Sequence, residues 1–149
     1  MYKHILIPYD GSGLSSKALT EGTELAKSIG AGLTLIHVVS PFHLHVQQWA
    51  TPQKVISKIE EEHIAETRES AQTMLSELEG RVRADGVRCD SVVVVGDSPY
   101  REIVDTAKKS GCDLIMMASH GRSGLDAILL GSETTKVLTH CSVPVLVVR

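Results

Sequence analysis

Five short apolar runs, separated by longer segments of helical character, constrain the fold of this chain most strongly. The runs are Ile5 to Pro8, Leu33 to Val39, Ser91 to Val95, Leu114 to Ala118 and Val143 to Val148. They are continuously apolar, as is typical of strands that are buried on both faces of a parallel sheet. Helices between the strands would then cover both faces. The sequence therefore predicts an α/β fold, a three-layer doubly wound domain with a five-stranded, mainly parallel sheet.

Helix signals occupy the segments between these runs. Ser12 or Ser15 can cap a helix that extends to about Ser28, where glycines follow. Residues 52–83 are rich in charge, lack an interior proline and continue to Gly86, which predicts one long helix.

Two further helices are expected in the C-terminal half. One starts after Ser98, a candidate cap, with Pro99 at its first position, and the other begins at Ser132. Apolar side chains on a shared helix face are predicted to pack on the sheet, namely Met74, Leu78 and Val82 in the long helix and Ile103, Val104 and Ala107 in the third.

Length and composition indicate one domain, residues 1–149. With 42% hydrophobic residues, the chain can bury a sizeable core. Its 15 Lys and Arg residues against 18 Asp and Glu residues give a formal net charge of −3, which argues against nucleic acid as a partner. No apolar run has membrane length, and the chain starts directly with an expected strand, so neither a membrane segment nor an export signal is predicted.

The three cysteines, Cys89, Cys112 and Cys141, form no Cys-x-x-Cys pair. An odd number of thiols without such spacing is typical of a reducing compartment, which predicts a cytoplasmic protein. His43 and His45 have no carboxylate or cysteine beside them in the sequence, so no metal site is predicted there.

A glycine-rich loop follows the fourth expected strand. Gly121 and Gly131 enclose nine residues, and Gly131-Ser132 opens the last helix. Backbone N–H groups and the positive end of a helix dipole then converge at one point, which suits a phosphate group. Arg122 and His120 lie in the same loop, where an arginine fork would match phosphate oxygens, although both residue types are also common as solvated loop residues.

A second polar position follows the first expected strand. Ligands of open α/β sheets bind beyond the carboxyl ends of the strands, where Pro8-Tyr9-Asp10-Gly11-Ser12 stands. The Asp10 carboxylate can accept hydrogen bonds from an adenine or a ribose. Position alone equally allows Asp10 to cap the following helix.

Taken together, these motifs resemble the universal stress protein family over essentially the whole chain. The family opens with a strand that ends in Pro-x-Asp-x-Ser, matched by Pro8, Asp10 and Ser12. Its nucleotide loop reads Gly-x-x-Gly, nine residues, then Gly-Ser or Gly-Thr, and the corresponding residues here are Ala118, Gly121, Gly131 and Ser132. The pair His37-Val38 and the final Pro-Val-Leu-Val-Val strand match as well.

The resemblance implies a Rossmann-like fold with the strand order 3-2-1-4-5. In the ATP-binding-type subgroup it also implies a bound adenine nucleotide, ATP or AMP, with any Mg²⁺ brought by the phosphates. Carried over by motif, adenine would lie against Asp10 and the backbone of Val38, and the ribose near Ala118. The phosphates would contact Gly121, Gly131, Ser132 and Glu133, and the predicted binding set is completed by Pro8, Tyr9 and Arg122.

Two positions in this set carry conditions. Ala118 replaces a family glycine and can offer the same backbone N–H only if its φ is negative. Glu133 would serve through its backbone N–H, with its side chain directed to solvent.

Other nucleotide sites and catalytic motifs fit less well. The P-loop string is absent. A dinucleotide loop reads Gly-x-Gly-x-x-Gly, and after Gly11-Ser12-Gly13 the position of its third glycine is occupied by Ser16. The same stretch resembles the Ser-Gly-Gly-x-Asp-Ser loop of adenylating pyrophosphatases, but the inner aspartate is missing. Without paired carboxylates, a nucleophile elbow or a cysteine beside a base, no catalytic residue is predicted, and any ATP hydrolysis would be slow.

The expected function is therefore that of a regulatory or stress-response module whose nucleotide occupancy alters contact with an unidentified protein partner. Two alternatives stay open: a dimeric stress protein that works without nucleotide and, less favoured, an adenylating pyrophosphatase-type enzyme. The final strand, Val143 to Val148, is apolar and would form a sheet edge, which favours pairing with a second copy. In the family this strand pairs antiparallel across a dimer axis, so a homodimer is predicted.

Overall fold

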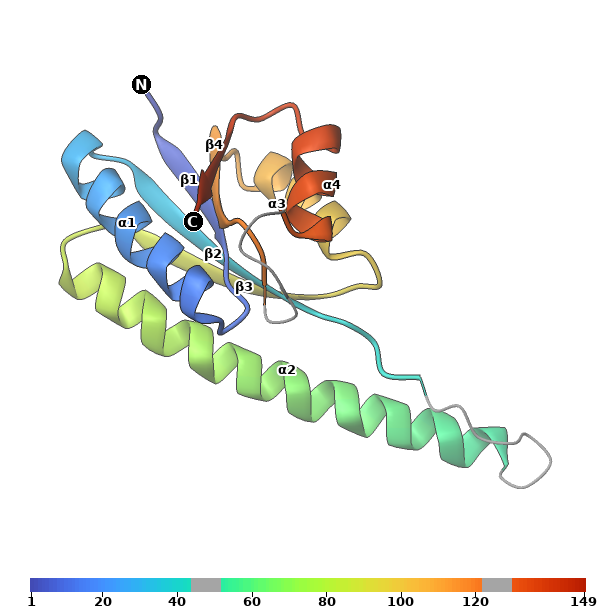
Figure 1. Ribbon diagram of the computed structural model, residues 1–149. Coiled ribbons are helices and arrows are strands. Elements are labelled where there is room, and N and C mark those ends of the chain that lie inside the picture. The colour runs from blue at the N-terminus through green and yellow to red at the C-terminus, as the bar shows by residue number, and fades with distance from the viewer. Residues whose placement is uncertain (44–51, 122–129) are drawn as a thin grey trace.

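Strands and helices alternate along the parts of the chain that the computed structural model describes, residues 1–43, 52–121 and 130–149 (Figure 1). The elements in chain order are β1 His4–Pro8, α1 Gly13–Ile29, β2 Gly32–Val39, α2 Gln53–Ala84, β3 Cys89–Val95, α3 Pro99–Lys109, β4 Leu114–Ala118, α4 Ser132–His140 and β5 Val145–Val148.

The strands form one five-stranded sheet in the order β3-β2-β1-β4-β5. Every neighbouring pair in it is parallel, with Ile5 opposite both Leu33 of β2 and Leu114 of β4. The central strand β1 is flanked on one side by β2 and on the other by β4, so the strand order reverses there. The predicted doubly wound α/β fold and its strand order are confirmed.

Helices cover both faces of the sheet, which gives three layers (Figure 1). One core cluster joins α1 and α2 to the sheet and includes Val82 together with the partly buried Met74 and Leu78. The cluster on the opposite face takes Ile103, Val104 and Ala107 from α3 and Val137 from α4. The inward positions predicted for α2 and α3 are therefore confirmed. The N-terminal half of α2 projects beyond the sheet (Figure 1).

Strand limits differ from the prediction at both edges of the sheet. The last strand begins at Val145 instead of Val143, because Pro144 has no N–H to donate; its carbonyl still accepts a bond from the Ile115 amide at 2.9 Å. At the other edge β3 begins at Cys89, two residues before Ser91. An edge strand tolerates the exposed Asp90, which hides the start of the strand from an apolar pattern.

The two serines predicted as helix caps differ in the structure. Ser12 caps α1, where its side-chain oxygen accepts a hydrogen bond from the Ser15 amide at 3.1 Å. Ser98 takes the N-cap position of α3, but its side chain makes no cap hydrogen bond. In the described part of the chain no helix is both long and apolar enough to cross a membrane.

Candidate functional site

A pocket of about 430 Å³ lies beyond the carboxyl ends of β1, β2 and β4, at the point where the strand order reverses. Three helices, α1, α3 and α4, begin beside it. The residues that line it are Pro8, Tyr9, Asp10, Ser15, Ile36, His37, Val38, Pro99, Ile103, Met117, Ala118, His120, Gly121, Gly131, Ser132, Glu133 and Thr134.

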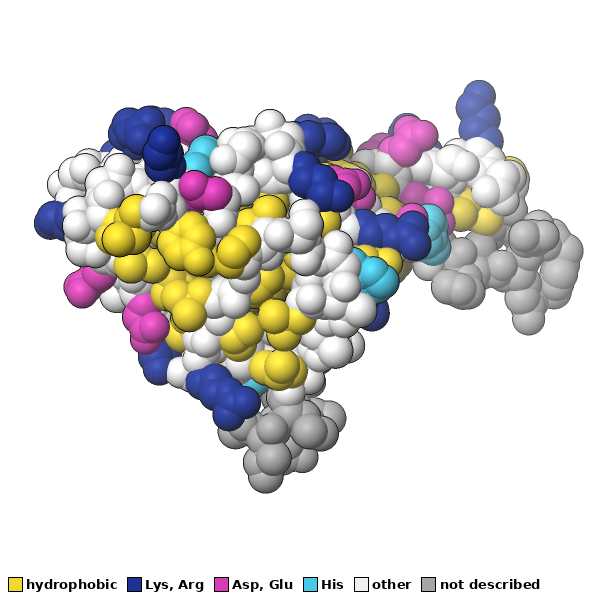
Figure 2. Space-filling model, turned by 90° about the horizontal axis from the view of Figure 1, so that it is seen from above, with side chains coloured by type: hydrophobic (Ala, Val, Ile, Leu, Met, Phe, Trp, Pro, Cys, Tyr) yellow, Lys and Arg dark blue, Asp and Glu magenta, His cyan; other side chains and the backbone are white. Residues whose placement is uncertain are grey.

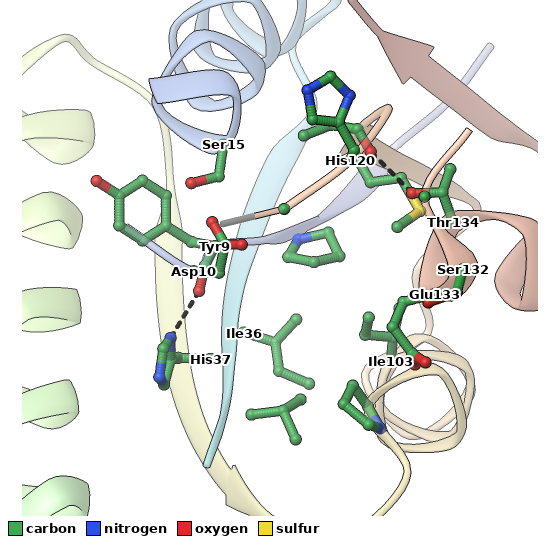
Figure 3. Close-up of a pocket in the computed structure, with 17 residues that line it drawn as sticks. Tyr9, Asp10, Ser15, Ile36, His37, Ile103, His120, Ser132, Glu133 and Thr134 are labelled. Atoms are coloured by element: carbon green, nitrogen blue, oxygen red, sulfur yellow. Dashed lines mark hydrogen bonds between the residues drawn. The ribbon is translucent and has the colours of Figure 1, made fainter. Parts of the chain in front are cut away.

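Apolar side chains form the inner part of the pocket. Ile36 and Val38 come from β2, Met117 from β4 and Ile103 from α3. Ile36 and Ile103 point toward the centre of the view in Figure 3. An apolar slot between polar walls can hold a planar base by dispersion and burial, and leaves recognition of its edge to the polar groups around it.

Asp10 lies on one wall and is held by its own turn (Figure 3). Its Oδ1 accepts a hydrogen bond from the Ser12 amide at 2.9 Å. Because Ser12 itself is the N-cap of α1, the alternative that Asp10 caps this helix is wrong. The carboxylate instead lines the pocket beside Gly121.

The neighbouring Tyr9 turns its ring away from the pocket (Figure 3). The ring packs against the core cluster under α1 and α2, and its hydroxyl lies 3.1 Å from the Ser16 Oγ atom. The Tyr9 carbonyl pairs with His37 Nδ1 at 2.7 Å, which ties the end of β1 to β2. Tyr9 therefore contributes mainly backbone to the site.

Two glycines of the predicted loop are required by close contacts. A Cβ atom at Gly121 would lie 2.6 Å from Asp10 Oδ2, and one at Gly131 would lie 3.0 Å from the His120 Cα atom. The Gly131 amide donates to the Ser119 carbonyl at 2.7 Å, which holds the start of α4 against the end of β4. These glycines serve close approach, because Gly131 has an ordinary φ of −60°.

Ala118, the departure from the family glycine, fits the backbone. No described residue other than glycine has a positive φ, so the condition on Ala118 is met. It ends β4 as a buried residue, and its carbonyl accepts a hydrogen bond from the Thr134 hydroxyl at 3.1 Å.

Glu133 differs from the expectation. Its carboxylate does not simply face solvent: Oε2 accepts a hydrogen bond from the Tyr100 amide at 2.8 Å, and Oε1 accepts one from Lys136 Nζ at 2.7 Å. Tyr100 lies in the first turn of α3, where Ser98 supplies no side-chain cap. An orphan amide at a helix start needs an acceptor, and the neighbouring helix provides it.

The three helix starts at the pocket are thus not equivalent. Ser12 caps α1 and Glu133 supplies an acceptor to α3. The start of α4, after Gly131, has no side-chain cap from the residues that the structure describes. Among the described residues, the α4 amides of Ser132 and Glu133 are therefore candidate donors to an external anion.

Nine of the ten predicted binding residues line this pocket: Pro8, Tyr9, Asp10, Val38, Ala118, Gly121, Gly131, Ser132 and Glu133. Arg122 lies outside the described residues. His120 lines the pocket and has its Nδ1 atom 3.1 Å from the Ser119 hydroxyl. The binding roles of these residues stay predictions.

Several lining residues were not predicted to belong to the site, among them Ser15, Ile36, Pro99, Ile103, Met117 and Thr134. Ile36 and Met117 could have been inferred, since adjacent parallel strands end at the same edge of a sheet. Nothing in the sequence distinguished Ile103 from the other core residues of α3.

Comparison with known proteins agrees with this geometry. The family model described as "Universal stress protein family" matches residues 1–149. The chain belongs to the universal stress protein family. Universal stress protein MJ0531 of Methanocaldococcus jannaschii is 35% identical over 153 residues, which cover 100% of this chain and 83% of the relative.

Solved structures of the family have the same fold. The structure of protein MJ0577, also from M. jannaschii, aligns with a TM-score of 0.83 and 32% identity over 99% of this chain and 96% of its own. A universal stress protein in complex with cAMP aligns with a TM-score of 0.69 and 25% identity over 99% of this chain and 97% of its own.

Proposed function

We propose that this universal stress protein is an adenine-nucleotide-binding regulatory module. The observation that carries the proposal is the open start of α4, which meets an apolar slot and the Asp10 carboxylate in one pocket. The slot suits the base, Asp10 suits the amino edge of adenine or a ribose hydroxyl, and the α4 amides suit a phosphate. The related structure with cAMP supports this choice of ligand class.

Regulation without substantial turnover is the proposed mode of action. The carboxylates that line the pocket are Asp10 and Glu133, and each accepts a hydrogen bond from a backbone amide. We assign neither carboxylate a role as a general base. Occupancy would instead alter the surface at the start of α4, which a protein partner could recognise. The cytoplasmic location stays a prediction.

The first test uses the protein as purified. The protein is heat-denatured, and any released nucleotide is identified by chromatography; we expect ATP, ADP or AMP. Titration calorimetry of the emptied protein with ATP and AMP then gives the affinities. An empty protein that binds neither nucleotide would contradict the proposal and favour the nucleotide-independent dimer.

A substitution at Gly131 tests the phosphate position. Gly131→Asp adds a negative charge at the N-cap of α4, and its Cβ would crowd the His120 Cα atom at 3.0 Å. Nucleotide affinity should fall on the order of tenfold or more, because like charge opposes the phosphate. Gly80→Asp is the matched control, since a Cβ there meets nothing within 4 Å and the residue lies on α2. Unchanged affinity in Gly131→Asp would contradict a phosphate at α4.

A further inference from the structure

Glu133 presents groups of opposite polarity to the same pocket, a backbone N–H and a carboxylate. Its backbone amide lies at the open start of α4, while its carboxylate also lines the pocket (Figure 3). In Figure 3, Ser132 and Glu133 stand on the wall opposite Tyr9 and Asp10. A phosphate attracted to the α4 amides would therefore find a carboxylate beside it.

This carboxylate is held in place by bonds to two helices. Oε2 accepts from the Tyr100 amide of α3 at 2.8 Å, and Oε1 accepts from Lys136 Nζ, one turn later on α4, at 2.7 Å. The Glu133 side chain is 35% exposed, so it lies between pocket and solvent. A group fixed at both oxygens does not swing away from an arriving phosphate without losing a hydrogen bond.

The same bond removes a second anion position. The start of α3 would otherwise offer the Tyr100 amide to an external phosphate, because Ser98 makes no side-chain cap bond and the Arg101 and Glu102 amides donate to the Ser98 carbonyl. Glu133 occupies the Tyr100 amide with an internal anion instead. A chain of phosphates that starts at α4 therefore has no second helix start to reach at α3.

The negative charges that line the pocket also oppose a chain of phosphates. Among the described residues that line it, the acids are Asp10 and Glu133. Lys136 neutralises Glu133 only in part, since the Lys136 side chain is 48% exposed and its charge is screened by water. Each additional phosphate group adds negative charge, and its repulsion by the Glu133 carboxylate grows accordingly.

We propose that Glu133 is a specificity-determining residue that makes the pocket select adenine nucleotides with one phosphate group over those with two or three. This selection rests on the proposed function, because it assumes that an adenine nucleotide binds in this pocket. The single phosphate lies at the start of α4, and the Glu133 carboxylate opposes the further phosphates of ADP and ATP.

Calorimetric titration with AMP, ADP and ATP in the presence of EDTA tests the selection. Without divalent cations to neutralise the phosphates, their full negative charge faces the Glu133 carboxylate. The wild-type protein should then bind AMP most tightly and ATP least tightly. Glu133→Gln keeps an amide oxygen for the Tyr100 N–H, and it removes the negative charge together with the ion pair to Lys136. We expect ATP affinity to rise on the order of tenfold relative to AMP in this variant.

Glu102→Gln is the matched control. It removes one negative charge from the first turn of α3, but Glu102 lines a different groove, beside Val92 and Thr106. The ratio of ATP to AMP affinity should stay at the wild-type value. Circular dichroism establishes whether both variants are folded. If Glu133→Gln does not fold, the order of the wild-type affinities for AMP, ADP and ATP still tests the proposed selection.

The outcomes separate the two proposals. Wild-type protein that binds ATP more tightly than AMP, or a Glu133→Gln variant that shifts both affinities equally, overturns the selection and leaves nucleotide binding intact. Wild-type protein that binds none of the three nucleotides overturns the proposed function itself.

Discussion

Burial decides how the cysteine side chains behave. Burial raises the pKa of the Cys89 thiol to about 12 and that of Cys112 to about 11, while Cys141 is only half-buried. The thiolate is the reactive form, so Cys89 and Cys112 should be inert in the folded protein. We expect one thiol to react quickly with DTNB in the native state and three in denaturant.

Cys141→Ser provides the control for this assignment. The variant should lose the rapid phase and keep the two slow thiols. Rapid modification of two or three thiols in the native wild-type protein would show that the core around Cys89 or Cys112 opens readily.

The Asp113 carboxylate, directly before β4, binds the start of β1 and links stability to pH. Asp113 accepts hydrogen bonds from the amides of Lys3 and His4 at 2.9 to 3.0 Å. Although burial acts to raise the pKa of Asp113, these backbone hydrogen bonds, from His4 and then Lys3, outweigh it and the pKa is lowered. A lowered pKa stabilises the folded state above the unfolded-state pKa of about 3.9 and loses this effect as pH falls through the folded-state value.

Asp113→Asn should therefore reduce stability at pH 7, and the difference from wild type should shrink below about pH 4. Urea denaturation of both proteins at a series of pH values between about 7 and 3 measures it. The same substitution at Asp105, which is exposed on α3, should show no such pH-dependent difference. A difference that stays constant down to about pH 3 would mean that the charge of Asp113 is not involved.

Glu133 illustrates what a sequence conceals at the scale of one residue. Its place in the first turn of α4 was predicted, and with it the position of its amide. The partner of its carboxylate was not, since Tyr100 lies 33 residues earlier in the chain. Tyr9 shows the same contrast. Its position at the end of β1 follows from the local sequence, whereas the direction of its ring depends on the packing of α1 and α2.

At the scale of elements, two serines that look alike as caps behave differently. Ser12 caps α1 with a hydrogen bond at 3.1 Å, whereas Ser98 makes no such bond at the start of α3. Ser12→Ala should therefore lower the free energy of unfolding by about 1 kcal/mol, and Ser98→Ala should leave it nearly unchanged. Chemical denaturation of the two variants measures both values, and equal losses would contradict the assignment of caps.

Element types and their order followed from the sequence, whereas some limits did not. Continuous apolar runs mark β1, β2 and β4 because these strands are buried between helices. The edge strands β3 and β5 are partly solvated, so Asp90 and Pro144 shift their starts by two residues from the predicted positions. A pattern based on burial is weakest where burial is incomplete.

At the scale of the whole molecule, hydrophobic side chains gather on the face shown in Figure 2. The edge strand β5 leaves Leu146 44% exposed, and Leu138 of the adjacent α4 is 41% exposed. Among the described strands, β5 pairs only with β4, and an apolar sheet edge favours pairing with a second copy, as predicted from the sequence. We propose that the protein forms a two-fold dimer through β5.

Leu146→Lys should weaken this dimer by placing a charge at the strand pair, with an increase in the dissociation constant on the order of tenfold or more. Sedimentation velocity over a range of concentrations measures it. Val55→Lys is the control, because Val55 is 46% exposed at the start of α2, away from β5. A wild-type protein that stays monomeric at high concentration would refute the dimer.

The sequence by itself determined the α/β class, the order of the elements and the position of the glycine loop, because apolar runs, helix caps and glycine spacing act over a few neighbouring residues. Only the tertiary structure decided which groups meet: Gly121 against Asp10, and the Glu133 carboxylate against the Tyr100 amide of α3. These contacts join residues far apart in the chain. Their distances depend on how the strands and helices pack together, which no local pattern records.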